Sequence, residues 1–358
     1  MDSVANSRMA TSKDVARRAG VSQATVSAAL HGTRSNIRVS EATRQRVLAA
    51  ATELVYLPHL GAQTLRRQRS GIIGYVPRFL RETLYERPVP YYLSTHIARA
   101  AMHHGYHVIE VNAESSQTRM SEQLIQFLLS QRVEGVILDA PASSDEVRHF
   151  VARGVPVVQL LRPQPVAEAS TIKVDAAQGL NSAVDHLCAL GHTLIAFIGT
   201  GGSDPVDMAR LTSVRAALER AALAMPDPYF AFSDSRSAEA GYRAMRNLLT
   251  LPEPPTAVLI MGDVLALGVL RLLYEQHVRV PDALSVISYG NTFAAFLSPP
   301  LTSVGQPFQE IGEQAVVLLI ERLGGTTAAN NIPEHILLPT ELVLRASTGP
   351  PARGRTSP

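Results

Sequence analysis

Residues with catalytic or metal-binding potential are scattered along the 358-residue chain and do not show the spacings that such chemistry needs. None of the 11 histidines lies in an HExxH pattern, and no GxSxG nucleophile elbow occurs. A glycine-rich loop at residues 199–203 follows a predicted strand, but it lacks the spacing of a dinucleotide-binding or ATP-binding loop. The single cysteine, Cys188, excludes an internal disulfide and a multi-cysteine metal site. We therefore expect no catalytic residues, no metal and no cofactor.

Basic side chains are concentrated near the N-terminus. Residues 1–70 carry 11 Lys and Arg against 4 Asp and Glu, a net charge of +7. The remainder carries 22 basic and 27 acidic residues, a net charge of −5, so the overall +2 conceals two oppositely charged parts. Such asymmetry indicates a small anion-binding module, most often for nucleic acid, joined to a larger body. On charge alone, a solvated basic face is the plainer alternative.

Three short helices are predicted within the basic segment. Thr11 and Asp14 form a capping-box pattern at the start of the first helix, which Gly20 ends. Ser22 caps a second helix after a two-residue turn, and Ser40 caps a third. Two short helices joined by a tight turn are typical of the helix-turn-helix, whose second helix enters the major groove of DNA. The apolar stripe expected on the third helix comprises Val47, Leu48, Ala51, Leu54 and Val55.

The residues of these helices resemble the DNA-binding headpiece of the LacI/GalR family of bacterial transcription regulators. The matching segments are residues 14–22, 25–27, 39–47 and 56–58. Because several segments recur at the family's separations, the signal is far more specific than an isolated helix-turn-helix pattern. The resemblance implies a headpiece over residues 9–57, a hinge over 58–69, an effector-binding and dimerisation core over 70–346, and a disordered tail over 347–358.

By this resemblance, the outward positions of the recognition helix carry small and polar residues: Ser22, Gln23, Ala24, Thr25 and Ser27. Gln23 can read an adenine edge bidentately, whereas the hydroxyl residues suit phosphate or sugar contacts. Ala28 stands where many members have an arginine, which predicts either a methyl contact to thymine or specificity that depends on DNA shape. Thr11, Arg34 and Arg38 complete the expected headpiece contacts, although each arginine is equally compatible with simple solvation.

Residues 58–65 resemble the family's hinge helix, and the basic run 66–69 follows them. A helix of this length is unstable alone in water, and Gly61 lowers its helix propensity by about 1 kcal/mol relative to Ala. It is therefore expected to fold only when two hinges pack together on DNA. The resemblance implies that Ala62 and Leu65 contact DNA, with Leu65 as the apolar wedge that enters a minor-groove step. Alternatively, Leu65 covers the core.

From residue 70 onward, short β-rich runs alternate with helical stretches. This alternation predicts parallel sheets covered by helices on both faces, with ligands at the carboxyl ends of the strands. By resemblance, this part is a periplasmic-binding-protein-like core of two lobes, joined by crossovers near residues 173–175, 304–308 and 337–342. The predicted strands are residues 71–76, 108–112, 133–138, 155–160, 195–199, 257–261 and 284–288, and helices are predicted at 93–104 and 120–131.

The family core holds a small effector in the cleft between its lobes, which implies five effector-binding residues here. They are Tyr91, Tyr92, Arg210, Asp263 and Asn291. An arginine can hold a sugar hydroxyl or a carboxylate as a fork. The tyrosine pair could stack on a sugar face or simply pack at the start of a helix.

Three positions depart from the sugar-binding members of the family. Gly290 and Leu161 stand where an aspartate is common, and Gly262 stands where an asparagine is common. Asn291 could replace these polar groups only in part. We therefore expect an effector with fewer hydroxyl groups than a hexose, or no effector.

The predicted fold is a small all-α helix-turn-helix headpiece followed by an α/β two-lobed core with parallel sheets. The predicted protein is a transcriptional regulator, a repressor that binds double-stranded operator DNA as a homodimer and responds to a small molecule. The alternative is a solute-binding protein or a sugar-active α/β enzyme. The first twenty residues contain no apolar run suited to export, so a cytoplasmic location and no membrane partner are expected.

Overall fold

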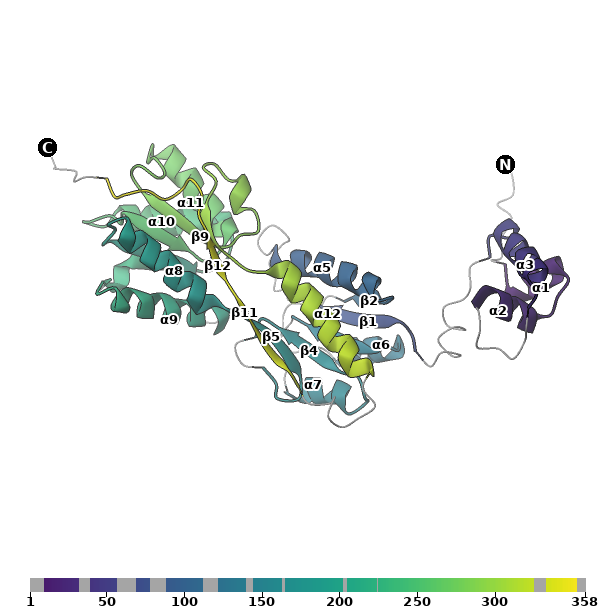
Figure 1. The fold of residues 1–358 in the computed structure, drawn as a ribbon. Helices are drawn as coiled ribbons and strands as arrows, with labels where there is room; N and C mark the ends of the chain where they lie inside the picture. Colours follow the sequence, from purple (N-terminus) through teal and green to yellow (C-terminus); the bar gives the residue numbers. More distant parts are fainter. Residues whose placement is uncertain are drawn as a thin grey trace. The chain divides into compact units, whose positions relative to one another are not determined.

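The computed structural model describes residues 10–31, 39–56, 69–77, 88–111, 122–139, 144–162, 165–201, 205–223, 225–324 and 333–352. The chain divides into two compact units, and the boundary falls between Ser70 and Gly71. The first unit contains the predicted headpiece, and the second contains the two predicted lobes (Figure 1).

The headpiece contains the three predicted helices: α1 (Ser12–Ala19), α2 (Gln23–His31) and α3 (Glu41–Glu53). The capping box is confirmed, because the Thr11 backbone N–H donates to the Asp14 carboxylate at 3.0 Å and the Asp14 N–H donates to Thr11 Oγ1 at 3.4 Å. Gly20 ends α1 with a φ of 67°, a left-handed conformation that glycine adopts without steric cost. Ser22 and Ser40 accept the backbone N–H groups of Thr25 and Thr43 at the next two helix starts.

The apolar stripe predicted for α3 is correct only in part. Val47 is fully buried, and Ala50, which the prediction omitted, joins it in the core. Leu48 is 40% exposed and Val55 is 79% exposed. Leu48 lies one residue from Val47, about 100° around the helix, so the two side chains face different directions. Val55 follows the end of α3, where helical spacing no longer applies.

Lobe 1 is built on a six-stranded, fully parallel sheet with the order β11-β5-β4-β3-β1-β2. One face is covered by α5 and α12, and the other by α6 and α7 (Figure 1). The strands are β1 (Ile72–Val76), β2 (His107–Glu110), β3 (Gly135–Leu138), β4 (Val157–Leu160), β5 (Ser170–Asp175) and β11 (His335–Pro339). The helices are α5 (Val89–His103), α6 (Glu122–Ser130), α7 (Ser144–Val151) and α12 (Phe308–Gly324).

Lobe 2 repeats this plan with the strand order β12-β10-β9-β8-β6-β7. All neighbouring strands are parallel except β12, which runs antiparallel to β10. Helices α8 and α9 pack on one face, and α10 and α11 on the other (Figure 1). The strands are β6 (Ile195–Thr200), β7 (Phe230–Ser233), β8 (Ala257–Ile260), β9 (Ser285–Gly290), β10 (Thr302–Gly305) and β12 (Glu341–Val343). The helices are α8 (Ala176–Ala189), α9 (Pro205–Arg220), α10 (Ala238–Leu249) and α11 (Asp263–Glu275).

The chain passes between the lobes three times, at the predicted places. It leaves lobe 1 between β5 and α8, returns between β10 and α12, and crosses again between β11 and β12. Thr340 ties the first and third crossovers together, since its hydroxyl donates to the Asp175 carbonyl at 2.6 Å and accepts from the Gly179 N–H at 3.0 Å. A Cβ on Gly179 would lie 2.4 Å from a Val304 methyl group, so only glycine permits this close approach.

The tail predicted as disordered from residue 347 is ordered in its first part. Ser347 is fully buried, donates to the Val286 carbonyl at 2.5 Å and accepts from the Thr302 N–H at 2.8 Å. Gly349 bonds to Ser285 through both its N–H and its carbonyl group. Residues 347–352 therefore belong to lobe 2, which corrects the predicted end of the core.

Candidate functional sites

The first turn of α2 presents the polar residues predicted for the recognition helix. Ser22, Gln23 and Ala24 are exposed, and Thr25 and Ser27 are partly exposed. The Ser22 hydroxyl lies 2.9 Å from that of Thr25 and also caps the helix. Gln23 presents a carboxamide, which carries adjacent donor and acceptor groups, at the exposed start of the helix. The exposed Gln23 amide is therefore the side chain in this turn best suited to read a base edge.

Ala28 differs from the neighbouring positions because its side chain is only 8% exposed. A methyl contact to thymine requires an accessible methyl group, so this burial favours the other prediction, specificity through DNA shape. Thr11 is half-buried and held by its capping box. The predicted contacts Arg34, Arg38, Ala62 and Leu65 lie outside the described residues.

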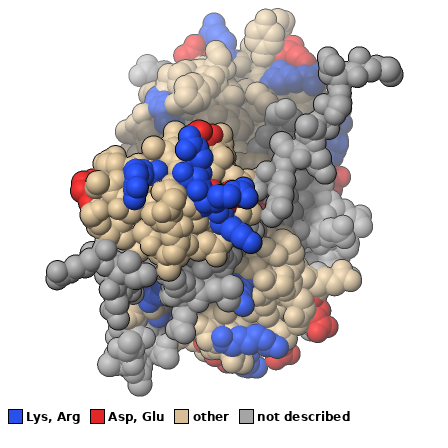
Figure 2. Space-filling view, turned by 90° about the vertical axis from the view of Figure 1, so that its right-hand side faces the viewer, with Lys and Arg blue, Asp and Glu red and all other residues tan. Residues whose placement is uncertain are grey.

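Exposed basic side chains surround these helices. Figure 2 shows Lys and Arg side chains gathered on the surface of the headpiece. Two of them have carboxylate partners: Arg17 pairs with Asp14 and Arg18 with Glu53, each at 2.8 Å. Exposed ion pairs of this kind contribute at most about 1 kcal/mol and exchange readily for phosphate partners. The exposed basic residues are Lys13, Arg17, Arg18, Arg44 and Arg46.

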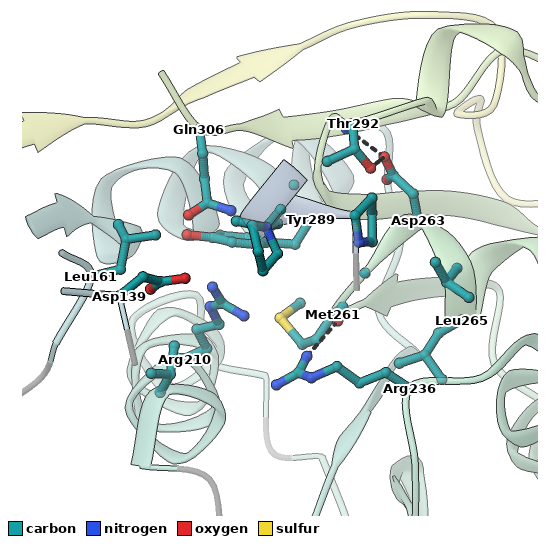
Figure 3. Close-up of a pocket in the computed structure, with 17 residues that line it drawn as sticks. Asp139, Leu161, Arg210, Arg236, Met261, Asp263, Leu265, Tyr289, Thr292 and Gln306 are labelled. Atoms are coloured by element: carbon teal, nitrogen blue, oxygen red, sulfur yellow. Dashed lines mark hydrogen bonds between the residues drawn. The ribbon is translucent and has the colours of Figure 1, made fainter. Parts of the chain in front are cut away.

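A cavity of about 110 Å³ lies between the two lobes at the carboxyl ends of their strands (Figure 3). Lobe 1 contributes an apolar wall together with one carboxylate, that of Asp139, directly after β3. Lobe 2 contributes Arg210, Arg236 and Tyr289, and the second crossover contributes Gln306. The apolar lining residues are Pro88, Val89, Pro90, Leu161, Val206, Met261, Val264 and Leu265.

The two pocket arginines are held by one buried carboxylate. Asp207 accepts from Arg210 Nη1 at 3.1 Å and from Arg236 Nη2 at 2.7 Å, and it also accepts from the Thr200 hydroxyl. Burial alone would raise the pKa of Asp207, but the two guanidinium groups outweigh it and the pKa is lowered. The Arg210 guanidinium lies over the Tyr289 ring, 4.2 Å from its centroid. Asp207 therefore stays ionised and fixes both arginines at the cavity.

Asp263 lines the pocket, but its carboxylate does not serve the predicted effector contact. It accepts five hydrogen bonds, from the Ser288 hydroxyl, from both the N–H and the hydroxyl of Thr292, and from the N–H groups of Phe293 and Ala294. Its residue is 3% exposed. These bonds saturate the carboxylate, so Asp263 positions the 292–294 loop instead of offering an oxygen to a ligand.

Three other predicted effector residues do not line the cavity. Tyr92 donates its phenol hydrogen to the Thr292 carbonyl at 2.7 Å, which links lobe 1 directly to lobe 2. Tyr91 is 38% exposed, next to it on α5. Asn291 Oδ1 accepts from Arg345 Nη2 at 2.8 Å. The structure therefore brings only Arg210 and Asp263, of the five predicted residues, to the cavity.

The predicted loss of polar groups is confirmed in position, because Leu161, Gly262 and Gly290 all line the cavity. The prediction missed five polar lining residues. Asp139 could have been found from its place at the end of a strand, and Gln306 from its place in a crossover, whereas nothing in the sequence pattern marks Arg236. Those five residues are Asp139, Arg236, Tyr289, Thr292 and Gln306.

A helix-turn-helix headpiece joined to a two-lobed sensor with an interlobe cavity defines a class of protein, the ligand-responsive DNA-binding regulators. The comparisons with known proteins agree with this class. The family model described as bacterial regulatory proteins, lacI family, matches residues 11–59, and that of a periplasmic binding protein-like domain matches residues 184–348.

The whole chain also has relatives. It is 34% identical to the HTH-type transcriptional repressor CytR of Escherichia coli K12, over 95% of this chain and 96% of that protein. It is 35% identical to the E. coli K12 ribose operon repressor, over 88% of this chain and 93% of that protein. A crystal structure of the Lac repressor dimer bound to operator and the anti-inducer ONPF matches with a TM-score of 0.82 and 29% identity, over 96% of this chain and 100% of that chain. The chain belongs to the LacI family of bacterial regulatory proteins.

Family membership makes this chain a DNA-binding transcriptional regulator and not an enzyme. The predictions of a LacI-family repressor fold and of an effector-modulated regulator are confirmed. Among the helices that the structure describes, none is both long enough and apolar enough to span a membrane.

Proposed function

We propose that this chain represses transcription in the cytoplasm by binding a two-fold symmetric operator as a homodimer, and that a small molecule in the interlobe cavity changes operator affinity. The observation that carries the proposal is the exposed Gln23 at the start of α2, among exposed Lys and Arg side chains. The basic groups supply affinity for the phosphate backbone, and Gln23 supplies sequence information.

An apolar patch on α11 supports the homodimer. Leu267 is 46% exposed and Tyr274 is 84% exposed, and their seven-residue separation puts them on one side of the helix. We call these two residues the α11 patch. Large exposed apolar side chains on one face favour a protein partner. The Lac repressor dimer matched above shows that this architecture assembles in pairs, so we assign the patch to a second copy of the chain.

The interlobe cavity supports the regulatory role. Residues of both lobes line it, and the Tyr92 bond to Thr292 joins the lobes nearby. A ligand that prefers one lobe arrangement shifts the population toward it, and operator affinity changes by the same coupling factor. Two similar proteins of known structure hold small molecules, the transcriptional regulator CelR with cellobiose and a LacI family regulator of Enterococcus faecium with ribose, and they support a small-molecule effector. The hinge over residues 58–69, with Ala62 and the Leu65 wedge, is proposed as the segment that transmits this change.

In vitro transcription tests the proposal. A promoter is built around a DNA site selected by the full-length chain, and transcription is measured with the wild type and with Gln23→Ala. The wild type should lower transcription from this promoter and not from one with a scrambled site, and Gln23→Ala should repress less. Activation, or equal effects on both promoters, would reject the repressor function.

A further inference from the structure

We infer that the effector carries an oxyanion, a carboxylate or phosphate group, which binds at the interlobe cavity between Arg210 and Arg236. The inference rests on the proposed role of this cavity as the effector site, and it names the class of ligand. Figure 3 shows the two guanidinium groups approaching each other from two sides of the cavity.

The Asp207 carboxylate holds the two arginines in a fixed orientation. Asp207 holds one nitrogen of each guanidinium group, and the side chains of Arg210 and Arg236 are only 12% and 13% exposed. Thr200 donates to the same carboxylate, so Asp207 cannot rotate without losing several bonds. A guanidinium group that is already oriented loses little conformational freedom when it binds an anion. The pair therefore has the fixed geometry that oxyanion recognition needs.

Arg210 presents a suitable edge to a ligand. Its Nη1 is bonded to Asp207 and its flat face lies on Tyr289, so neither is available. Its Nε is buried and has no hydrogen-bond partner among the described residues. Nε and the adjacent Nη2 form the side-on fork that binds two oxygens of a carboxylate or phosphate. A buried unpaired donor is costly, and such an anion would satisfy it.

The cavity wall lacks a polar side chain at three positions where the sugar-binding members of the family have one. A hexose needs several polar side chains to satisfy its hydroxyl groups, but Leu161, Gly262 and Gly290 provide none. The lobe 1 wall is largely apolar, which suits a compact ligand body with few hydroxyl groups. Gln306 Oε1 is buried and has no hydrogen-bond partner in the described part of the chain, so it can accept one hydrogen bond from the body of the ligand.

Asp139 provides an internal control on the sign of the ligand charge. Its residue is 4% exposed, and Figure 3 shows its carboxylate directed toward Arg210. A negative charge at this place opposes an incoming anion. If the effector is an oxyanion, Asp139→Asn should strengthen its binding and Arg236→Gln should weaken it. A cationic ligand would show the reverse pattern.

The test measures thermal stabilisation of the full-length chain at constant ionic strength. The probes are inorganic phosphate and two matched pairs, ribose 5-phosphate with ribose and benzoate with benzamide. At least one acid should raise the Tm more than its neutral partner does. Arg236→Gln should lower the affinity of the chain for that acid by at least about tenfold, equivalent to ~1.4 kcal/mol. Arg243→Gln removes an arginine of α10 that pairs with Asp234 on the surface, and it is the matched control.

Each outcome decides the inference. Stabilisation by an acid that falls in Arg236→Gln, persists in Arg243→Gln and rises in Asp139→Asn supports it. The inference fails if no acid stabilises the chain beyond its neutral partner, or if the stabilisation survives Arg236→Gln unchanged. Operator binding of the wild type is measured in parallel, both without ligand and with each probe. Absence of operator binding under all of these conditions would reject the proposed function, whereas operator binding without any acid response would reject only the oxyanion.

Discussion

The base recognition that we propose for this chain depends on one exposed amide. Gln23 lies at the N-terminal end of α2, the end of a recognition helix that contacts base edges in the major groove. The Ser22 and Thr25 hydroxyl groups bond to each other, and that of Ser22 also accepts from the Thr25 backbone N–H, so both are better placed for the DNA backbone than for bases. A substitution of Gln23 should therefore lower the affinity for the specific operator without lowering the affinity for random DNA.

Gln23→Ala should weaken specific operator binding by about 1–3 kcal/mol, because one bidentate base contact is lost. Binding to random DNA should change little, since the phosphate contacts remain. Fluorescence anisotropy with both DNAs at one salt concentration measures the difference. Gln45→Ala is the control, since Gln45 is an exposed glutamine on α3 that bonds to Glu41. An equal loss on both DNAs, or the same loss in the control, would contradict the assignment.

We expect Asp263 to act on the stability of lobe 2 rather than on ligand affinity. Asp263→Ala removes a carboxylate that accepts five hydrogen bonds and takes the acceptor from the buried N–H and hydroxyl donors of Thr292. We expect a loss of about 3 kcal/mol or more in the unfolding free energy, measured by urea denaturation. Asp234→Ala, at a surface ion pair, should cost less than about 1 kcal/mol. An Asp263→Ala chain with full stability but no effector response would restore the sequence-based interpretation.

At the scale of elements, apolar runs were easier to predict than polar strands. All seven predicted strands are present, and they include the fully buried β3, β4 and β8. The prediction missed β5, β7, β10, β11 and β12. Two of these strands, β5 and β10, begin with buried hydroxyl residues. These hydroxyl groups can be buried because residues distant in sequence form hydrogen bonds with them. Ser170, for example, accepts from Arg322. Such pairings depend on the tertiary fold and leave no local pattern.

The candidate site shows the same limit. Arg210 was found from a family position, and the three missing polar groups were found from departures at family positions. Arg236 reaches the cavity from the segment before α10, and only its long-range bond to Asp207 reveals its role. Asp263 was misassigned because its partners in the 292–294 loop are distant in sequence. A residue's position in the family pattern predicts whether it lies near the cavity. Its hydrogen-bond partners in the fold determine whether its polar atoms remain available to a ligand.

The ordered C-terminal segment is attached to lobe 2 through a buried histidine. His192 Nε2 lies 2.8 Å from the Gly349 carbonyl oxygen, and its Nδ1 lies 2.9 Å from the Thr256 hydroxyl. Burial lowers the pKa of His192 from its ordinary value of 6.5, while the Gly349 contact acts in the opposite direction. The native chain thus binds this proton less readily than the unfolded chain. The contribution of the neutral His192 ring to the unfolding free energy is therefore complete above pH 6.5, and it is lost as the pH falls through the native pKa of His192.

We therefore expect the Tm of the wild type to fall between neutral pH and pH of about 5, and to fall less in His192→Gln. The partly buried His186, whose pKa burial also lowers, contributes in the same direction, so some pH dependence should remain in the variant. His103→Gln, at an exposed position of α5, is the control and should follow the wild type. An unchanged pH dependence in His192→Gln would contradict this account.

At the scale of the whole molecule, two headpieces must be held together for a symmetric DNA site to be read. The α11 patch is the proposed contact, because the described chain leaves the Tyr274 side chain 84% exposed and a second copy could cover it. Tyr274→Asp combined with Leu267→Asp should convert the dimer to a 38.6 kDa monomer, as measured by analytical ultracentrifugation. Phe127→Asp, at a 45% exposed position on α6, is the control. A dimer that persists at micromolar concentration would place the interface elsewhere.

Operator affinity should fall together with dimerisation in these variants. A single headpiece contacts one half-site, so the second contact is no longer intramolecular and its avidity is lost. Because the headpiece itself is unchanged, the weak affinity of each single chain for random DNA should stay the same.

Selection of duplexes from a random pool by the full-length wild type tests the central claim most directly. The account predicts an enriched inverted repeat, with two half-sites separated by about one helical turn or a multiple of it. Enrichment should fall with Gln23→Ala and with the paired α11 substitutions. No enrichment, or a single unpaired site that survives both sets of substitutions, would contradict a dimeric, operator-reading regulator.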